Sequence, residues 1–170
     1  MCGIAGIYSF ENINVDLLTA LTSLQHRGQD AAGVLLFNKK FILKKGLGLV
    51  KDVFNDESIL NLNGNVGVGH VRYTTQGENT EESAQPMFIN YPIGIGMAHN
   101  GNVTNTAELK NILFEKYHYI PKTTNDLELL LYLFTANLNI NELTIENIFE
   151  SVKYVQSIAK GAYSVLTIIS

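Results

Sequence analysis

Cysteine and tryptophan are almost missing from this chain, which has one cysteine and no tryptophan among 170 residues. A single cysteine excludes an internal disulfide framework. The net charge is −4, and no basic stripe carries interleaved aromatic residues. Nucleic acid is therefore not an expected partner, because its binding depends on clustered positive charge and stacking side chains.

Long apolar runs and a secretory leader are also missing. The apolar stretch 127–138 is interrupted by Glu128 and is too short to span a bilayer. The N-terminus has no positively charged segment followed by an apolar one. Hydrophobic residues make up 46% of the chain and charged residues 16%, which is enough apolar material for one globular core. We therefore expect a single cytoplasmic domain over residues 1–170, with no membrane partner.

Hydrophobic periodicity predicts strands and helices in separate clusters. Because they do not alternate strictly, the pattern favours a layered α+β fold over a doubly wound parallel sheet. Two capping boxes are expected, pairing Asn105 with Glu108 and Asn125 with Glu128. The predicted strands are 4–8, 32–37, 41–45, 66–72, 93–99 and 162–169, and the predicted helices cover 15–25, 145–158 and the segments that follow the two capping boxes.

Two chain features concern where strands end. The dipeptide Asn100-Gly101 is typical of a hairpin turn and is expected to terminate the strand 93–99. The last predicted strand runs into the C-terminus, and a domain does not usually stop on an apolar strand. We therefore expect the fold to be incomplete at that end.

The single cysteine is residue 2, directly after the initiator Met1. Removal of Met1 would leave one residue that carries both a thiol and a free α-amine. The thiolate is the nucleophilic form, and an α-amine with a pKa of about 8 can accept the thiol proton. Cys2 is therefore a candidate N-terminal nucleophile. The alternative is that position 2 only requires a small residue.

Three other places suit the binding of an amide substrate. An amide side chain and a backbone N–H at Asn100 and Gly101 could both donate to one oxyanion. Arg72 could hold a carboxylate through two parallel hydrogen bonds, and Asp126 could receive an ammonium group. The alternatives are an ordinary turn, a surface arginine and a carboxylate that complements a helix dipole. Together, Arg72 and Asp126 describe a pocket for a free amino acid.

Metal binding is not expected. The four histidines lack the spacing of metal ligands, and no second cysteine accompanies them. The clustered glycines do not open a helix after a strand, so they form no phosphate-binding fingerprint.

Five motifs, in their order along the chain, resemble the class II glutamine amidotransferases, which are N-terminal-nucleophile hydrolases. The His-Arg-Gly-Gln-Asp and Gly-His-Val-Arg-Tyr-x-Thr forms look most like the amidophosphoribosyltransferase family, which moves glutamine nitrogen onto phosphoribosyl pyrophosphate at the start of purine synthesis. Glucosamine-6-phosphate synthases form a sister group and usually carry an aromatic residue before Arg-Gly. The five motifs are Met1 to Ile4, Leu24 to Asp30, Gly69 to Tyr73, Ala98 to Asn102 and Gly161 to Ser164.

The resemblance implies a four-layer αββα sandwich in which Cys2 is the mature N-terminal nucleophile. It implies that Asn100 and Gly101 form the oxyanion hole, that Arg72 binds the α-carboxylate of glutamine and that Asp126 binds its α-ammonium. The other implied site residues are Tyr73 and Thr75, in a segment that closes over glutamine, and Arg27 and Gly28, which support the N-terminal site.

The resemblance also concerns partners. In the family a phosphoribosyltransferase domain follows, which uses Mg²⁺ with phosphoribosyl pyrophosphate, and the complete enzymes are expected to be homo-oligomers. This chain is expected to hold no cofactor, and it lacks the cysteines with which some members bind an iron–sulfur cluster. Three functions stay open: a glutaminase that delivers ammonia to a synthase domain in cis or in trans, an inactive truncated fragment, and a hydrolase of another amide.

Overall fold

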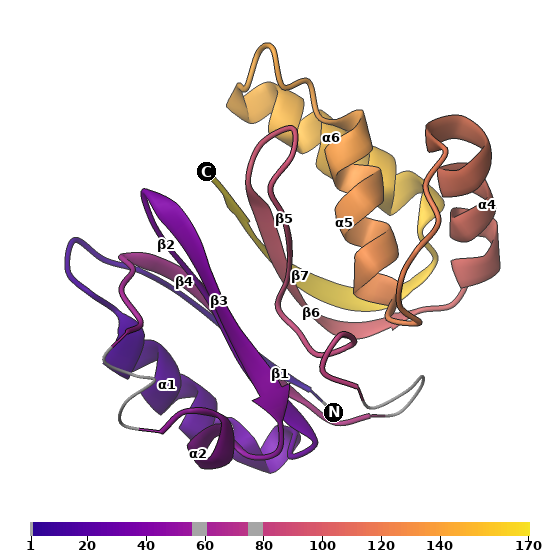
Figure 1. Cartoon of the computed structure of the whole chain (residues 1–170). Coiled ribbons are helices and arrows are strands. Elements are labelled where there is room, and N and C mark those ends of the chain that lie inside the picture. Colours follow the sequence, from indigo (N-terminus) through magenta and orange to yellow (C-terminus); the bar gives the residue numbers. More distant parts are fainter. Residues whose placement is uncertain (1, 56–60, 75–79) are drawn as a thin grey trace.

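Two antiparallel sheets lie face to face in the computed structural model, which describes residues 2–55, 61–74 and 80–170 (Figure 1). The first sheet has the strand order β1-β4-β2-β3, with β1 at Gly3–Tyr8, β4 at Val66–Arg72, β2 at Ala31–Asn38 and β3 at Lys40–Leu47. The second has the order β5-β6-β7, with β5 at Met87–Ile89, β6 at Ile95–Val103 and β7 at Gly161–Ile169.

Helices cover the outer face of each sheet, as Figure 1 shows. Helices α1 and α2 pack on the first sheet, and helices α4, α5 and α6 pack on the second. The expected four-layer αββα arrangement is therefore confirmed. No helix in the described ranges has the length and apolar composition needed to cross a membrane. The bounds are α1 Asn14–Ser23, a 3₁₀ turn η1 at Gln25–Arg27, α2 Val50–Val53, α4 Thr106–Tyr117, α5 Asp126–Asn137 and α6 Ile145–Ile158.

The apolar sequence of β2 follows from its burial on both faces. Because successive side chains of a strand point to opposite sides, Leu35 lies between the sheets while Val34 and Leu36 face α1. Leu35 packs with Val68 of β4 and Ala98 of β6. A strand between two packed layers has no polar side to present, so its sequence does not alternate.

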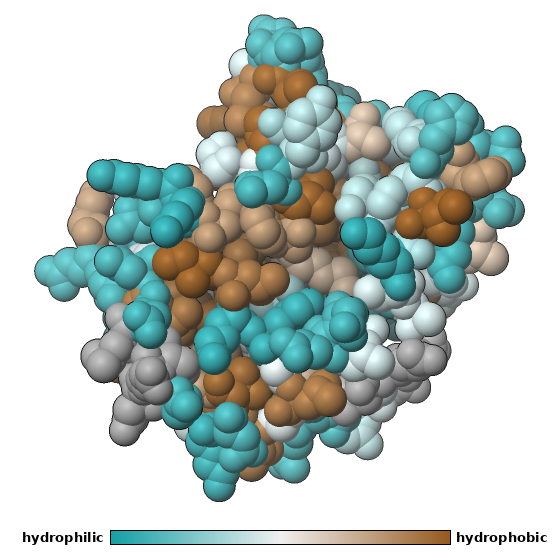
Figure 2. Space-filling view, viewed as in Figure 1, coloured by the Kyte–Doolittle hydropathy of each residue, from teal (hydrophilic) through white to brown (hydrophobic). Residues whose placement is uncertain are grey.

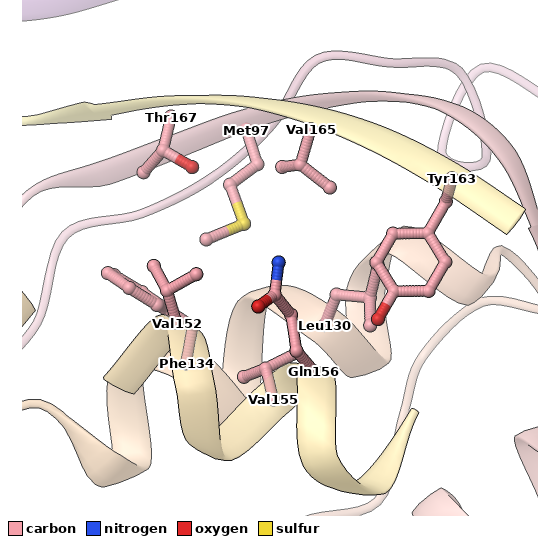
Figure 3. Close-up of a pocket in the computed structure, with 9 residues that line it drawn as sticks. All are labelled: Met97, Leu130, Phe134, Val152, Val155, Gln156, Tyr163, Val165 and Thr167. Carbon is pink, nitrogen blue, oxygen red and sulfur yellow. The ribbon is translucent and has the colours of Figure 1, made fainter. Parts of the chain in front are cut away.

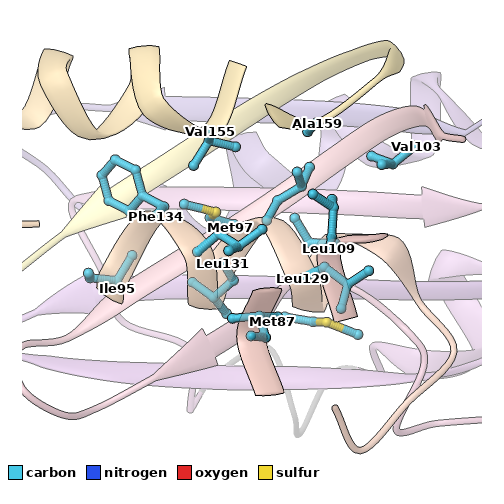
Figure 4. Packing of buried hydrophobic residues seen from close by; sticks show 14 of the residues in the cluster. Met87, Ile95, Met97, Val103, Leu109, Leu129, Leu131, Phe134, Val155 and Ala159 are labelled. Carbon is cyan, nitrogen blue, oxygen red and sulfur yellow. The ribbon is translucent and has the colours of Figure 1, made fainter. Parts of the chain in front are cut away.

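Besides the two clusters on either face of β2, a third hydrophobic core lies between the second sheet and its helices. Figure 4 shows its packing. Helix α5 is buried almost all round because β5, β6, α4 and α6 surround it. Leu129, Leu131 and Phe134 of α5 meet Met97 of β6 in this cluster. Burial of such side chains stabilises the fold by about 1.5–3 kcal/mol each.

The sheets do not close against each other along one side. An open groove of about 370 Å³ runs between edge strands β3 and β5, with Leu43, Met87 and Ile89 among its lining residues. Figure 2, drawn from the same side as Figure 1, shows hydrophobic surface in this part of the molecule.

The expected hairpin turn at Asn100-Gly101 is wrong. Strand β6 continues through both residues to Val103, and Gly101 pairs with Tyr163 of β7. The nine-residue ladder with β7 provides the backbone partners that a turn would otherwise have to supply. Gly101 has φ +147, which is a conformation that glycine adopts readily and other residues rarely do.

The two capping boxes form only in part. Asn105 makes no side-chain cap, because its Oδ1 accepts a hydrogen bond from the backbone N–H of Lys160 instead, while its Nδ2 donates to Glu108 and to the carbonyl of Ile158. Asn125 does cap α5, accepting a hydrogen bond from the backbone N–H of Leu127. Glu128 does not close this second box, since its carboxylate is occupied by the loop before the helix.

That loop is organised around the buried carboxylate of Glu128. It accepts hydrogen bonds from the Tyr119 hydroxyl, from the backbone N–H of Lys122 at 2.8 Å, and from both the backbone N–H and the hydroxyl of Thr123 at 2.7 Å. Burial raises the pKa of Glu128, but these donors outweigh it and hold the pKa below its ordinary value. Glu128 thereby fixes the segment that leads into α5.

We expect Glu128→Gln to lower the free energy of unfolding by about 1–3 kcal/mol at pH 7, because the carboxamide cannot accept all of these hydrogen bonds. Since the folded pKa is depressed, the stabilisation is fully present above the unfolded pKa of about 4.3 and is lost as pH falls through the lower folded value. Urea denaturation at pH 7 and pH 3.5 should show a smaller difference from wild type at pH 3.5. Glu150→Gln is the control, since Glu150 is exposed and forms a solvent-exposed ion pair with Lys153. An equal difference at both pH values would contradict this.

Candidate active site

Strand pairing brings the N-terminus next to the end of β4. Gly3 pairs with Val71 in the antiparallel ladder, so Cys2 lies beside the residues that follow β4. The Cys2 thiol donates to the carbonyl oxygen of Tyr73, with 3.7 Å between Sγ and O. Nε of Arg27 donates to the carbonyl oxygen of Cys2 at 3.0 Å. The candidate nucleophile is thus held by contacts with two distant segments (Figure 1 marks the N-terminus between the ends of the two sheets).

The turn after η1 packs directly against the backbone of β4. A Cβ at Gly28 would lie 2.6 Å from the carbonyl carbon of Arg72, so only glycine allows this approach. The backbone N–H of Asp30 donates to the carbonyl of Arg72 at 2.9 Å, and the Asp30 carboxylate accepts from the backbone N–H of Thr74 at 2.7 Å. This turn therefore fixes the chain on both sides of Arg72.

Strand β6 brings Asn100 and Gly101 to the same end of the sandwich. Gly101 lines the pocket that also contains Cys2, and Asn100 is half-buried in the adjacent position. Just before them, the backbone N–H of His99 donates to Oε1 of Gln85 at 2.7 Å, and both of these residues are buried. The backbone leading into the Asn100-Gly101 pair is therefore fixed.

Gly101→Ala should damage this end of β6 in two ways. The φ of +147 strains any other residue, and the added Cβ would lie 2.3 Å from the carbonyl oxygen of Ala162. We expect a loss of about 1–3 kcal/mol in the free energy of unfolding. Urea denaturation of Gly6→Ala provides the comparison, since the nearest atom to that Cβ would be 3.2 Å away in the flexible Leu166 side chain. Equal stability of the two variants would show that β6 is not constrained at Gly101.

A buried arginine and a half-buried aspartate complete the pocket. Arg72 is only 5% exposed, so its interpretation as a surface arginine is wrong. Asp126 is the first residue of α5, and its Oδ2 accepts a hydrogen bond from the backbone N–H of Val103 at 2.8 Å. Its Oδ1 lies 3.7 Å from Nδ1 of His99. Asp126 therefore stands at the positive end of a helix and also lines the pocket.

These groups surround one polar pocket of about 150 Å³. It brings together the thiol of Cys2, the guanidinium of Arg72 and the carboxylate of Asp126. In the sequence, Arg72 is 70 residues from Cys2 and 54 residues from Asp126, and Cys2 and Asp126 are 124 residues apart. Tyr73 is exposed and also lines it, while Thr75 lies outside the described residues. The full lining is Cys2, Arg72, Tyr73, Gln85, His99, Gly101, Asn102, Val103, Thr106, Thr124, Asn125 and Asp126.

Two buried histidines belong to this region: His99 lines the pocket, and His70 lies close to His99 and Arg72. Burial, with smaller contributions from His99 and Arg72, lowers the pKa of His70 to about 3. Burial also lowers the pKa of His99, although nearby Asp126 acts in the opposite direction. Both rings are therefore neutral at neutral pH. Across residues 2–55, 61–74 and 80–170, no three His, Cys, Asp or Glu side chains gather closely enough to hold a metal ion.

Sequence reasoning missed Gln85, His99 and Asn125 as pocket residues. Gln85 and His99 meet only through the fold, so nothing in the local sequence around Gln85 indicates its role. Asn125 was expected only as a helix cap, yet its Nδ2 also donates to the carbonyl of Ser83 at 2.7 Å. In the sequence, its position next to the predicted site residue Asp126 was the feature that could have indicated a place in the pocket.

A second pocket, drawn in Figure 3, has a different character. Its volume is about 180 Å³, and it lies between β7 and helices α5 and α6. Met97, Leu130 and Val155 contribute to its mainly apolar walls. It contains no nucleophile and no charged side chain, so the first pocket is the candidate active site.

No protein-family model matches the chain. Among curated proteins, the amidophosphoribosyltransferase of Escherichia coli K12 is 44% identical over 174 residues, an alignment that covers 99% of this chain and 34% of that protein. The amidophosphoribosyltransferase of Saccharomyces cerevisiae is 38% identical over 172 residues, which covers 96% of this chain and 34% of that protein. The chain thus spans about a third of the length of these relatives.

Solved structures agree with this. One described as the allosteric regulatory enzyme of purine biosynthesis superposes with a TM-score of 0.85 and 32% identity, covering 99% of this chain and 35% of that one. The glutamine phosphoribosylpyrophosphate amidotransferase from B. subtilis, complexed with ADP and GMP, gives a TM-score of 0.83 and 31% identity over the same shares. In sequence and in its N-terminal-nucleophile hydrolase fold, the chain is therefore a homologue of the amidophosphoribosyltransferases and corresponds to their N-terminal region.

Proposed function

We propose that this chain hydrolyses glutamine to glutamate and ammonia through a thioester on Cys2. The observation that carries the proposal is the single pocket in which Cys2, Gly101, Arg72 and Asp126 meet. A cation and an anion beside a nucleophile suit a zwitterionic amino acid, and this argues against a hydrolase of simple amides.

The reaction begins at the N-terminus that removal of Met1 would expose. The α-amine of Cys2, directly or through one water, takes the thiol proton, and the thiolate attacks the side-chain carboxamide carbon of glutamine. The S–C bond forms as the carbonyl π electrons move to oxygen. The Asn100 amide and the Gly101 N–H donate to the resulting oxyanion.

Collapse of the tetrahedral intermediate breaks the C–N bond. The α-ammonium of Cys2 returns its proton to the departing nitrogen, which leaves as ammonia. Water then attacks the thioester, the C–S bond breaks, and glutamate and free Cys2 result. In this cycle Arg72 binds the α-carboxylate, Asp126 binds the α-ammonium, and Arg27 holds the carbonyl of Cys2.

The ammonia is proposed to serve a phosphoribosyltransferase domain, because the relatives are amidophosphoribosyltransferases about three times as long as this chain. Phosphoribosyl pyrophosphate and its Mg²⁺ would bind that domain, in cis or in trans. No step of glutamine hydrolysis runs through the metal.

Intact mass spectrometry after treatment with 6-diazo-5-oxo-L-norleucine, an electrophilic glutamine analogue, tests the proposal. We expect loss of Met1 and one adduct, located on Cys2. A chain that has lost Met1, forms no adduct and hydrolyses no glutamine would contradict the proposal. Iodoacetamide is the matched reagent, since it alkylates an accessible thiol without needing the glutamine pocket.

A further inference from the structure

One short segment, residues 82–85, contacts both walls of the candidate active site. Its Gln85 side chain accepts the hydrogen bond from the backbone N–H of His99, next to the Asn100-Gly101 pair on β6. Its Ser83 carbonyl accepts the hydrogen bond from Asn125, next to Asp126 at the start of α5. The segment therefore joins the oxyanion side of the pocket to the side that carries the carboxylate.

Lys45 of β3 holds this segment from the opposite side. Its Nζ donates to the carbonyl of Ala84 at 2.6 Å and to the carbonyl of Glu82 at 3.1 Å. Lys45 lines the groove between β3 and β5 and is not among the residues that line the active-site pocket. The hydrogen bonds of Lys45 therefore connect to the active site through the segment that it binds.

The side chain of Lys45 lies in a partly buried, charged environment. Burial lowers its pKa, the carboxylates of Glu81 and Glu82 act to raise it, and Arg72 acts to lower it. A partly desolvated ammonium bonds more strongly to carbonyl oxygens than an exposed one does. Its two hydrogen bonds are therefore stronger than those of an exposed surface lysine.

The first sheet is shaped to admit this contact. Gly33 of β2 stands directly opposite Lys45 in the ladder between β2 and β3, so the two share one face of the sheet. A Cβ at Gly33 would lie 2.3 Å from the carbonyl oxygen of Gln85 and 2.7 Å from Cβ of Lys45. The missing side chain is what lets the segment and Lys45 meet over β2.

We propose that Lys45 is a positioning residue for glutamine hydrolysis: by holding residues 82–85, it fixes the oxyanion donors on β6 relative to Asp126 on α5. The inference rests on the function proposed above. Loss of the Lys45 contacts releases the segment at its Glu82 and Ala84 carbonyls. The two walls can then shift relative to each other, and misplacement by about 1 Å costs as much as 10²-fold in rate.

The test compares Lys45→Met, Lys45→Arg and Lys40→Met by steady-state glutamine hydrolysis. Lys40→Met is the matched control, since Lys40 is exposed on the same strand. For Lys45→Met we expect KM to rise about tenfold, because Asp126 is displaced, and kcat/KM to fall about 10²-fold, because the displaced oxyanion donors also lower kcat. Lys45→Arg keeps the charge and several donors, and we expect it to restore most of the loss.

The count of reactive Cys2 thiols separates positioning from simple loss of folded protein. Saturating 6-diazo-5-oxo-L-norleucine, which labels Cys2 through the formed glutamine pocket, should give the same number of modified Cys2 residues in Lys45→Met as in wild type. A variant that is only partly folded would show fewer sites and a lower kcat, with an unchanged KM. That pattern would overturn the proposal, and so would a Lys45→Met variant with wild-type KM and kcat/KM.

Two further outcomes are informative. If Lys45→Met does not fold, Lys45→Gln replaces it, because its shorter carboxamide cannot reach both carbonyls; an unchanged KM in folded Lys45→Gln overturns the inference. If the wild-type protein hydrolyses no glutamine, the proposed function fails and this inference fails with it. If wild type is active while Lys45→Met matches Lys40→Met, the inference alone fails.

Discussion

Replacing Cys2 by alanine should reduce glutamine hydrolysis by on the order of 10⁴-fold or more, since no other group in the pocket can form the thioester. The fold should survive, because the Cys2 side chain is half-buried and makes a single long hydrogen bond to the Tyr73 carbonyl. Release of glutamate, measured with a coupled dehydrogenase assay, gives the rate.

Binding of glutamine to the Cys2→Ala variant is the control for that result. Arg72 and Asp126 stay in place, so the variant should still bind glutamine. When chemistry is slower than glutamine dissociation, KM equals the dissociation constant, and calorimetry on Cys2→Ala should then give a value close to the wild-type KM. Hydrolysis by Cys2→Ala at the wild-type rate would rule out the thioester mechanism.

Asp126→Asn should raise KM for glutamine by about 10- to 100-fold, which corresponds to about 1.4–2.8 kcal/mol. The carboxamide can still accept the hydrogen bond from the Val103 N–H, so the local structure is kept while the charge facing the substrate ammonium is lost. The interaction is made equally in the ground state and the transition state, and kcat should therefore change little. Steady-state kinetics with glutamine provides the measurement.

Two comparisons make the Asp126 result specific. Glutaramic acid, which is glutamine without its α-amine, should be hydrolysed no worse by Asp126→Asn than by wild type. Asp16→Asn removes an exposed carboxylate from the first turn of α1, and it should leave KM unchanged. A KM unaffected by Asp126→Asn would leave Asp126 with structural roles alone, at the helix N-terminus and as the acceptor for the Val103 N–H.

Most strands and helices of this fold were predictable because they depend on local periodicity. The hairpin of β2 and β3 around Asn38 and Lys39, the helix after Val15 and the apolar strand β7 follow local patterns that the tertiary structure keeps. The αββα layering itself was implied by the family resemblance, and the superposition with related structures agrees with it.

What could not be predicted depends on contacts between distant segments. Asn100-Gly101 favours a turn in isolation, but pairing with β7 keeps both residues in a strand. Asn105 fits a capping box in sequence, but Ile158 and Lys160, more than 50 residues away, occupy its side chain. Glu128 fits the other box, but the loop before α5 folds around its carboxylate instead. The motifs did single out Cys2, Arg72 and Asp126, which the fold brings into one pocket, whereas the link between Lys45 and residues 82–85 left no local signal.

Strand β1, which carries the candidate nucleophile, lies at the edge of its sheet and pairs with β4 alone. Edge strands detach more readily than central ones, because only one ladder of hydrogen bonds has to open. Warming or mild denaturant should therefore disengage Cys2 from the pocket while the central strands remain intact. Glutamine hydrolysis would then be lost at a lower temperature than the secondary structure. An activity assay would therefore report a lower transition temperature than circular dichroism.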